Sequence, residues 1–354
     1  MSNKSGSIEK QITTIVPLKN GNGQILHNIK NLINSQPFES SKVYVSIEDS
    51  NEPLYSALKL IEDVENNFGV FIAGKPKGVN GKASNMLAAY NITDSEFVVF
   101  MDADVLVKKA NYHDLLNSFE DERCGAVFSA AFYHQANTIG GRMIRAVTNY
   151  FFGEAVLLFE RVIKMNYCAG AFMGFRKSAL DKAGGLNAVL NYISDDATLG
   201  NNIYNVGYKI KILNTPVFMP EEKLKLKEGV NHLIKWMVIV KQTMGGNYFF
   251  VPATFYTGNV ILLLALSIVT GELIIFSLLL VIFATAFRIF TAALQDKMLF
   301  GEFAGFFDYA FTIVAGYFQP LIWLAGFFFK TLSWSGRKYK IGKRGKILFI
   351  EEEK

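Results

Sequence analysis

The stretch "FVVFMDADVLV" (residues 97–107) decides the fold of this chain and the place of its chemistry. Its first five residues are all apolar and mostly β-branched or aromatic, which predicts a strand buried on both faces. Asp102 and Asp104 follow at once, separated by one small residue. Two carboxylates this close repel each other unless something positive lies between them. The stretch alone leaves open a metal ion, a basic side chain or neither.

Strand-like and helical segments alternate along the N-terminal part of the chain. The predicted strands cover residues 11–17, 43–47, 70–73, 97–101 and 125–130, and the predicted helices cover 24–35, 53–67 and 83–91. This alternation predicts an α/β fold, Rossmann-like, with a mostly parallel sheet and helices on both faces. Ligands bind such sheets outside the carboxyl ends of the strands, so a site is expected where strand 97–101 ends.

The C-terminal part is a different kind of sequence, almost continuously apolar from residue 249 to residue 330. Residues 251–270 and 273–294 each approach the ~20 residues that a bilayer-spanning helix needs. Neither segment has the polar face of a surface helix, and two residues separate them. We therefore predict a hairpin of two membrane-spanning helices.

A third apolar stretch covers residues 303–330, with Gln319 and Pro320 in its middle. We expect a break there, and a re-entrant or interfacial element instead of a third crossing. Positive charge is concentrated at 336–346, beside the membrane, which favours the cytoplasmic face and anionic lipid headgroups over nucleic acid. Two crossings place this basic segment and the N-terminal part on the same side.

Composition narrows the class of protein further. The 354 residues suffice for one sizeable domain with an appendage, and the net charge is a modest +5. The polar N-terminus has no apolar signal segment. Cys124 and Cys168 are too few and too isolated for a disulfide framework or a zinc site. We expect an integral, multi-pass membrane protein whose catalytic domain faces the cytosol, in the plasma membrane if the host is prokaryotic.

Three further charged features accompany the acids of the 97–107 stretch. They are Glu48 and Asp49 after the second predicted strand, Lys82 in "GKPKGVNGKASN" (74–85), and Asp195 and Asp196 in "YISDDATLG" (192–200). Taken singly, each has an ordinary explanation as a turn residue, a helix cap, a dipole partner or a solvated loop. Lysines and glycines before a helix also suit a diphosphate. The order of all four features in one chain favours a catalytic site.

Several segments carry a resemblance to a known family. They are Asp49, "GVNGKASN" (78–85), "DAD" (102–104), "CAGAFMGFRKSALDKAGGL" (168–186), "YISDD" (192–196), "HLIKW" (232–236) and "LSWSGRKYKI" (332–341). In this order they resemble the inverting family-2-type glycosyltransferases with an A-type nucleotide-sugar fold, and more closely the ceramide glucosyltransferase group of family 21. The resemblance covers essentially all of the chain after residue 10, and the 168–196 block is highly specific.

The chain departs from the group's pattern at a few places. The N-terminal membrane helix of the group is missing. His232 and Lys235 stand where the group usually has Gln or Arg and then Arg, and Asp195 replaces the more usual Glu. Lysine keeps the positive charge but lacks the planar fork of arginine, which argues against a bidentate phosphate grip at that position.

The resemblance implies a UDP-sugar donor bound by Asp49, Glu48, Lys82, Asn85 and Asp102. It also implies that Asp104, helped by Asp102, holds a divalent metal ion on the donor diphosphate. Hard carboxylate oxygens suit Mn²⁺ or Mg²⁺. Asp196, next to Asp195, is implied as the general base that deprotonates the acceptor hydroxyl for an inverting attack.

The implied acceptor is a membrane lipid such as ceramide, with diacylglycerol and a sterol or other polycyclic lipid left open. The implied contacts of the acceptor and the diphosphate are His232, Lys235, Trp236, His134, Arg337 and Tyr339. Residues 228–248 show the spacing of an amphipathic helix that lies in the membrane interface. His134, viewed alone, is more often a structural histidine.

The predicted organisation has five parts. They are a disordered segment (1–10), a cytosolic glycosyltransferase domain (11–227), the interface helix (228–248), a membrane domain (249–330) and a basic cytosolic tail (331–354). Two alternatives remain open: a processive polysaccharide synthase, which usually has more membrane helices, and a catalytically silent membrane scaffold that binds lipid. The intact acids speak against the silent scaffold. The transferred hexose is predicted as glucose, with galactose and N-acetylglucosamine left open.

Overall fold

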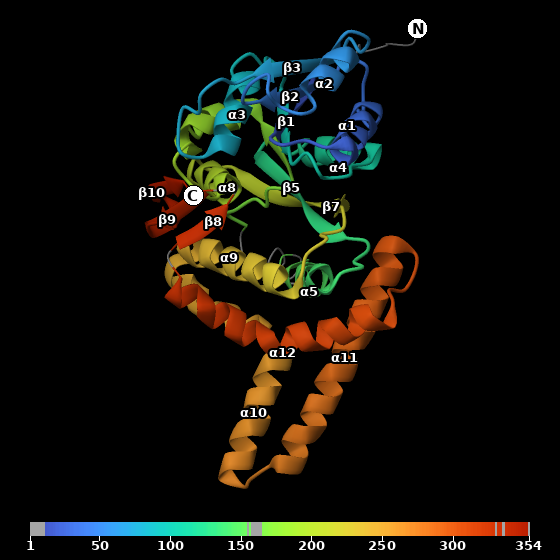
Figure 1. The fold of residues 1–354 in the computed structure, drawn as a ribbon, viewed down its shortest axis with the longest axis vertical. Helices are drawn as coiled ribbons and strands as arrows, with labels where there is room; N and C mark the ends of the chain where they lie inside the picture. The colour runs from blue at the N-terminus through green and yellow to red at the C-terminus, as the bar shows by residue number, and fades with distance from the viewer. Residues whose placement is uncertain (1–10, 154–155, 157–164, 330, 335–336, 353–354) are drawn as a thin grey trace. The chain divides into compact units, whose positions relative to one another are not determined.

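The computed structural model describes residues 11–153, 156, 165–329, 331–334 and 337–352 (Figure 1). The chain forms two compact units. The first, which we call the sheet unit, comprises Met1–Ala131 and Phe159–Phe218, and the second, the helical unit, comprises Phe132–Leu158 and Met219–Lys354. The predicted disordered segment 1–10 lies outside the described residues.

The sheet unit is built on a seven-stranded sheet with the order β3-β2-β1-β4-β6-β5-β7. Its strands are β1 (Ile12–Leu18), β2 (Lys42–Ile47), β3 (Phe68–Ile72), β4 (Phe97–Met101), β5 (Cys124–Tyr133), β6 (Phe172–Arg176) and β7 (Lys209–Met219). The first four strands run parallel, and β6 lies antiparallel between β4 and β5. This confirms the predicted α/β fold with a mostly parallel sheet. The strand patterns read from the sequence did not include β6 and β7.

The described helices of the sheet unit lie between its strands along the chain. They are α1 (Gly23–Asn34), α2 (Tyr55–Glu62), α3 (Gly81–Tyr90), α4 (Lys109–Ser118), α7 (Lys177–Lys182) and α8 (Asp195–Asn205), with the short helix η2 (Leu186–Val189). The Asn22 side chain accepts hydrogen bonds from the first turn of α1, and the Asn80 side chain does the same for α3. These caps fix the loops that leave the carboxyl ends of β1 and β3.

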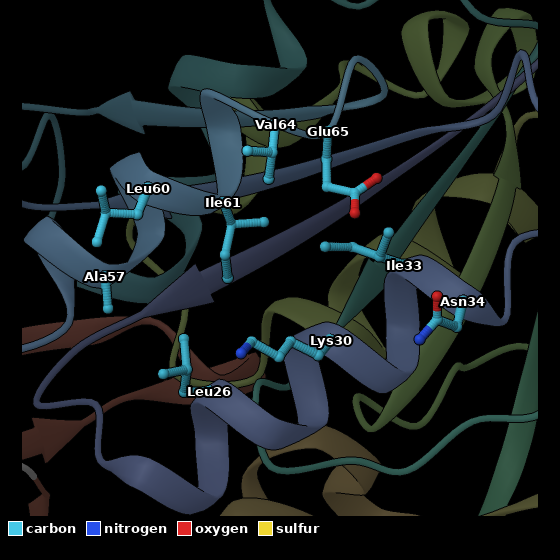
Figure 2. Close-up of a pocket in the computed structure, with 9 residues that line it drawn as sticks. All are labelled: Leu26, Lys30, Ile33, Asn34, Ala57, Leu60, Ile61, Val64 and Glu65. Carbon is cyan, nitrogen blue, oxygen red and sulfur yellow. The ribbon is translucent and has the colours of Figure 1, made fainter.

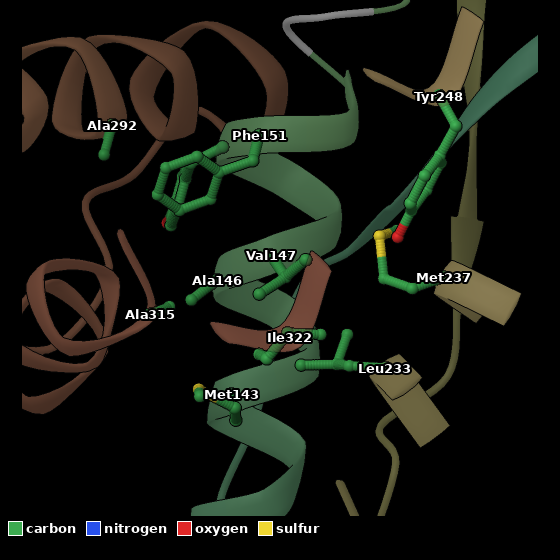
Figure 3. Close-up of a cluster of buried hydrophobic side chains, with 11 residues drawn as sticks. Met143, Ala146, Val147, Phe151, Leu233, Met237, Tyr248, Ala292, Ala315 and Ile322 are labelled. Atoms are coloured by element: carbon green, nitrogen blue, oxygen red, sulfur yellow. The ribbon is translucent and has the colours of Figure 1, made fainter. Parts of the chain in front are cut away.

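The helical unit consists of packed helices and a small sheet. Its elements are α5 (Ile139–Val147), the π-helix η1 (Thr148–Phe152), α9 (Leu226–Met244), η3 (Gly245–Thr254), α10 (Tyr256–Thr270), α11 (Ile274–Phe300), α12 (Phe306–Phe328), β8 (Thr331–Trp334), β9 (Arg337–Ile341), η4 (Lys343–Gly345) and β10 (Ile347–Glu352). Segment 331–352, predicted as a basic tail, therefore includes a three-stranded antiparallel sheet. Buried side chains from α5, α9, α11 and α12 form the core of this unit (Figure 3).

The apolar C-terminal helices include the predicted hairpin. Figure 1 shows α10 and α11 side by side, with α12 lying across the base of the hairpin. By length and composition, α11 and α12 could each span a membrane, whereas α10 does so only together with Leu226–Thr254 across a 70° bend.

The predicted break at Gln319 and Pro320 is wrong, because α12 runs through both residues. Pro320 removes one backbone donor from the helix, and its ring packs where α10 comes close. A Cβ on Gly258 of α10 would lie 2.5 Å from the Pro320 ring. A neighbouring helix of this kind lets a proline remain inside an apolar helix.

A buried ion pair holds α5 to α11 within the helical unit. The Arg145 guanidinium lies 2.9 Å from the Asp296 carboxylate, and their side chains are 2% and 1% exposed. The hydroxyls of Tyr150 and Tyr309 donate to the other Asp296 oxygen at 2.7 and 3.1 Å. Each charged group therefore has several partners, which is the condition for burying charge.

Asp296→Ala is expected to lower the free energy of unfolding by about 3–5 kcal/mol, because Arg145 is then left buried without its counter-charge. The matched control is Glu302→Ala, which removes the exposed carboxylate that pairs with His134. An exposed pair contributes at most about 1 kcal/mol. Thermal unfolding in detergent measures both variants, and equal losses would contradict this account of Asp296.

Candidate active site

The acids predicted at strand ends emerge on one edge of the sheet. Strands β2 and β4 both pair in parallel with β1, so Asp49 and Asp102 follow strands that end at the same side. The turn after β4 is fixed by two hydrogen bonds. The Asp102 amide donates to the Ala171 carbonyl at 3.1 Å, and the Asn28 side chain donates to the Asp104 carbonyl at 3.0 Å.

A basic side chain compensates the charge of the acidic pair. The Lys82 ammonium, on the first turn of α3, lies 2.5 Å from Asp102 Oδ1. Burial lowers the pKa of Lys82, but the carboxylates of Asp102, Asp195 and Asp196 together outweigh burial and raise it. The 97–107 stretch left open whether a positive group accompanies its two acids. The charged Lys82 side chain is such a group.

The same electrostatics show which acids lie close together. Burial is the largest effect on Asp102 and raises its pKa, Lys82 opposes that shift, and Asp104 and Asp195 add to it. The two acids after β4 and the first acid of α8 thus act on one another. The structure brings together the separately predicted "DAD" and "YISDD" motifs.

Asp195 is the most enclosed acid of this group, with 4% of the residue exposed. Its Oδ1 atom is 3.4 Å from the Asn80 side-chain amide, which also donates to the Tyr192 carbonyl at 2.8 Å. Its Oδ2 atom is buried and has no hydrogen-bond partner among the described residues. An orphaned carboxylate oxygen is costly in a folded protein, so it is typical of a site completed by a ligand.

Asp196 is held in one orientation by its neighbours. Its Oδ1 atom accepts from the Ser194 hydroxyl at 2.5 Å and from the Ala197 amide at 2.7 Å. The other oxygen, Oδ2, faces Gly170, where a Cβ would lie 3.0 Å away. Burial and the charge of Asp195 raise the pKa of Asp196, opposed by Ser194 and Lys82. The carboxylate is therefore a stronger base than an exposed aspartate.

The other residues predicted to bind the donor differ in burial: Asp49 is exposed, whereas Asn85 is buried. Asp49 is exposed and accepts from the Asn51 amide at 2.8 Å, while Glu48 pairs with Lys19 at 3.4 Å. Asn85 is buried, and its carbonyl accepts from the Ser46 hydroxyl at 2.5 Å. Its side-chain amide lies 3.5 Å from the Leu18 carbonyl, so Asn85 ties α3 to β1 and β2.

The predicted acceptor residues belong to the helical unit. On α9, the rings of His232 and Trp236 meet edge to face at 4.6 Å. Burial, followed by the charge of Lys235, lowers the pKa of His232 to about 4. His232 is therefore neutral at pH 7, like the glutamine that the family pattern often has there. Burial raises the pKa of Glu222, and Lys235 opposes that shift.

The other predicted acceptor residues are placed as follows. His134 pairs with Glu302 at 2.9 Å and stacks on Phe300. Arg337 and Tyr339 lie on β9, where Tyr339 is buried with 8% exposure. These contacts give each side chain a position inside the helical unit, and their predicted roles stay predictions.

Three residues of the site have roles that the sequence reasoning missed. Asn80 joins α3 to the segment before α8, Ser194 orients Asp196, and Gly170 leaves room beside it. All three lie inside segments that carried the family resemblance. These segments were recognised from the sequence, but the role of each residue follows only from its distances to other residues in the folded chain.

The acidic pair after β4 suits a divalent metal ion. Among the described residues, no group of three or more His, Cys, Asp or Glu side chains could hold a metal ion. Asp102 and Asp104 offer hard oxygen donors, and Mg²⁺-type sites often use one or two carboxylates with substrate phosphates and water. The donor set fits a metal ion that binds together with a diphosphate.

A groove of about 480 Å³ lies elsewhere in the sheet unit, between α1 and α2 (Figure 2). Its lining is Leu26, Lys30, Ile33, Asn34, Ala57, Leu60, Ile61, Val64 and Glu65. None of the acids at the sheet edge lines it. The groove is therefore separate from the candidate active site.

The mostly parallel α/β sheet with acids at one edge is the arrangement of a glycosyltransferase fold. The model of glycosyl transferase family 21 matches residues 10–347, so the chain belongs to that family. Among similar proteins, ceramide glucosyltransferase 1 of Caenorhabditis elegans is 21% identical over 347 residues, which cover 95% of this chain and 72% of the relative.

Two further comparisons agree with the family and the fold. Ceramide glucosyltransferase 3 of Caenorhabditis elegans is 18% identical over 233 residues, 64% of this chain and 50% of the relative. The solved structure of mannosyltransferase PcManGT from Pyrobaculum calidifontis, in complex with GDP-Man and Mn²⁺, matches with a TM-score of 0.51. It is 16% identical, and the match covers 88% of this chain and 86% of that one. This likeness concerns the fold.

Proposed function

We propose that the chain transfers a hexose, glucose, from a UDP-sugar to a hydroxyl of a membrane lipid such as ceramide, with inversion at the anomeric carbon. The observation that carries the proposal is the ion pair between Lys82 and Asp102. Asp104, Asp195 and Asp196 lie close enough to this pair to act on its charges. The names of the similar proteins support a lipid acceptor of the ceramide type.

The donor diphosphate is assigned to the Lys82 side of the set. Lys82 is in the first turn of α3, so its ammonium and the backbone amides of that turn favour an anion. Asp49 is assigned to the uridine part, together with Glu48 and Asn85. Asp104 and Asp102 would hold Mn²⁺ or Mg²⁺, which when bound neutralises charge on the departing diphosphate.

Asp196 is assigned the role of general base. The hydrogen bonds from Ser194 and Ala197 occupy Oδ1, so Oδ2 is the oxygen that would take a proton. The acceptor hydroxyl gives its proton to Oδ2 while its oxygen forms a bond to the anomeric carbon. The bond from that carbon to the diphosphate breaks, and UDP leaves from the opposite face. A positioned base of this kind contributes about 10²–10⁴ in rate.

The helical unit is assigned the membrane and the acceptor. The hairpin of α10 and α11 would anchor the chain as a multi-pass protein, with the catalytic domain on the cytosolic face. Neutral His232, with Lys235 and Trp236, is assigned to the acceptor or diphosphate side. His134, Arg337 and Tyr339 keep the same predicted role.

UDP release by detergent-solubilised protein tests the proposal. With UDP-glucose, Mn²⁺ and a panel of ceramide, diacylglycerol and a sterol, we expect release that depends on ceramide. Asp196→Asn is expected to lower it by about 10²–10⁴ because the base is lost. Asp94→Asn, which removes an exposed partner of Lys42, serves as the matched control and keeps activity. Equal release without lipid in wild type and Asp196→Asn would overturn the assignment.

The pH dependence of transfer tests the coupling of Asp195 to Asp196. The base acts when deprotonated, and the charge of Asp195 raises its pKa. Asp195→Asn removes that charge, so the pKa of Asp196 falls and the acid limb of kcat/KM moves to lower pH. The pH–rate profile measures this shift, with Asp94→Asn again as the control. A limb that stays in place or moves to higher pH would contradict the coupling.

A further inference from the structure

A small cavity of about 10 Å³ lies inside the helical unit. Its apolar lining comes from the end of α5, from η1, from α9, from the residue before α10 and from α12: Val147, Phe152, Leu233, Met237, Phe255 and Ile322. Gln319 of α12 is the polar member of the lining. Figure 3 shows Val147, Leu233, Met237 and Ile322 converging from their helices in this core.

The Gln319 side chain is not satisfied by the protein. The residue is 4% exposed, and its Oε1 atom has no hydrogen-bond partner in the part of the chain that the structure describes. Desolvating an amide oxygen without a partner is unfavourable, and a methionine or leucine would fill the same space without that cost. An amide at this position points to a ligand that donates a hydrogen bond.

The cavity lies beside the predicted acceptor residues of the same unit. Leu233 and Met237 each follow a motif residue on α9, namely His232 and Trp236. The Phe152 ring lines the cavity and packs 5.9 Å from the Trp236 ring, and both residues are only partly buried. Phe152 also ends the π-helix η1, and such turns occur frequently at functional sites. The Phe152 ring thus joins the lining of the cavity to the tryptophan of the motif.

We propose that this cavity receives the amide N–H of the acceptor lipid, which donates to Gln319 Oε1. A volume of this size accommodates one water-sized group, so a single polar group enters and the acyl chains stay outside. An N-acyl sphingoid lipid carries an N–H donor near its reacting hydroxyl, whereas diacylglycerol and sterols have no second donor. Gln319 thereby selects the sphingoid class of acceptor, an inference that rests on the proposed function.

Gln319→Met tests this subsite with ceramide and N-methylated ceramide as probes. We expect the KM for ceramide to rise about tenfold, with the KM for UDP-glucose unchanged and thermal stability unchanged or higher, since no buried amide remains unpaired. The KM for N-methylated ceramide stays the same in both proteins. Thr312→Val is the matched control, because Thr312 is buried in the same helix and its hydroxyl donates to the Asp308 carbonyl at 2.9 Å.

Binding of a fluorescent ceramide without donor gives a second readout, expected to weaken about tenfold in Gln319→Met. An unchanged KM and unchanged binding would overturn the proposal, as would an equal loss for ceramide and its N-methylated form. Lower thermal stability with unchanged KM would assign Gln319 to a structural water and overturn it too. If the wild type transfers no sugar to ceramide but Gln319→Met still weakens ceramide binding, the proposed function is wrong and the ceramide subsite is supported.

Discussion

The ion pair between Lys82 and Asp102 is the interaction on which the site depends. It joins the first turn of α3 to the end of β4, and it places one positive charge near the carboxylates of Asp102, Asp195 and Asp196. Without that charge, Asp102, Asp104 and the acids of α8 would repel one another, and the pKa values of Asp102 and Asp196 would rise further. The lysine lets the acids remain close together, as the proposed roles in binding a diphosphate and in general-base catalysis require.

Some buried polar groups of this protein are completely paired by its own side chains, and others keep an atom without a partner among the described residues. In the helical unit, Arg145 and Asp296 are fully paired, and two tyrosines complete the set, so this network stabilises the packing. Asp195 and Gln319 are the contrasting cases, since each keeps a buried oxygen without a partner among the described residues. Paired buried charge supports the fold, whereas an unpaired buried acceptor reduces stability and is typical of a place where a ligand binds.

The sequence predicted most of the sheet unit, because its signals are local. The run 97–101 is an uninterrupted apolar strand followed by acids, and β4 has those bounds. Strand β6 went unassigned, although it too is apolar, since it lies within a motif block and inserts between β4 and β5 from far along the chain. The break predicted at Pro320 is absent from α12, and the reason is again a contact between segments that are distant in the sequence. A close approach of Gly258 on another helix, invisible in the local sequence, accommodates the proline ring. The roles of Asn80 and Gly170 likewise depend on distances across the fold.

The central claim is that two residues of the site have separate roles: Lys82 binds the donor, and Asp196 deprotonates the acceptor. The most direct test is the Kd for UDP of Lys82→Met and Asp196→Asn, measured by calorimetry beside their transfer rates. The account predicts that Lys82→Met loses UDP affinity, whereas Asp196→Asn binds UDP as the wild type does and yet transfers sugar far more slowly. Loss of UDP affinity in Asp196→Asn with full affinity in Lys82→Met would contradict it.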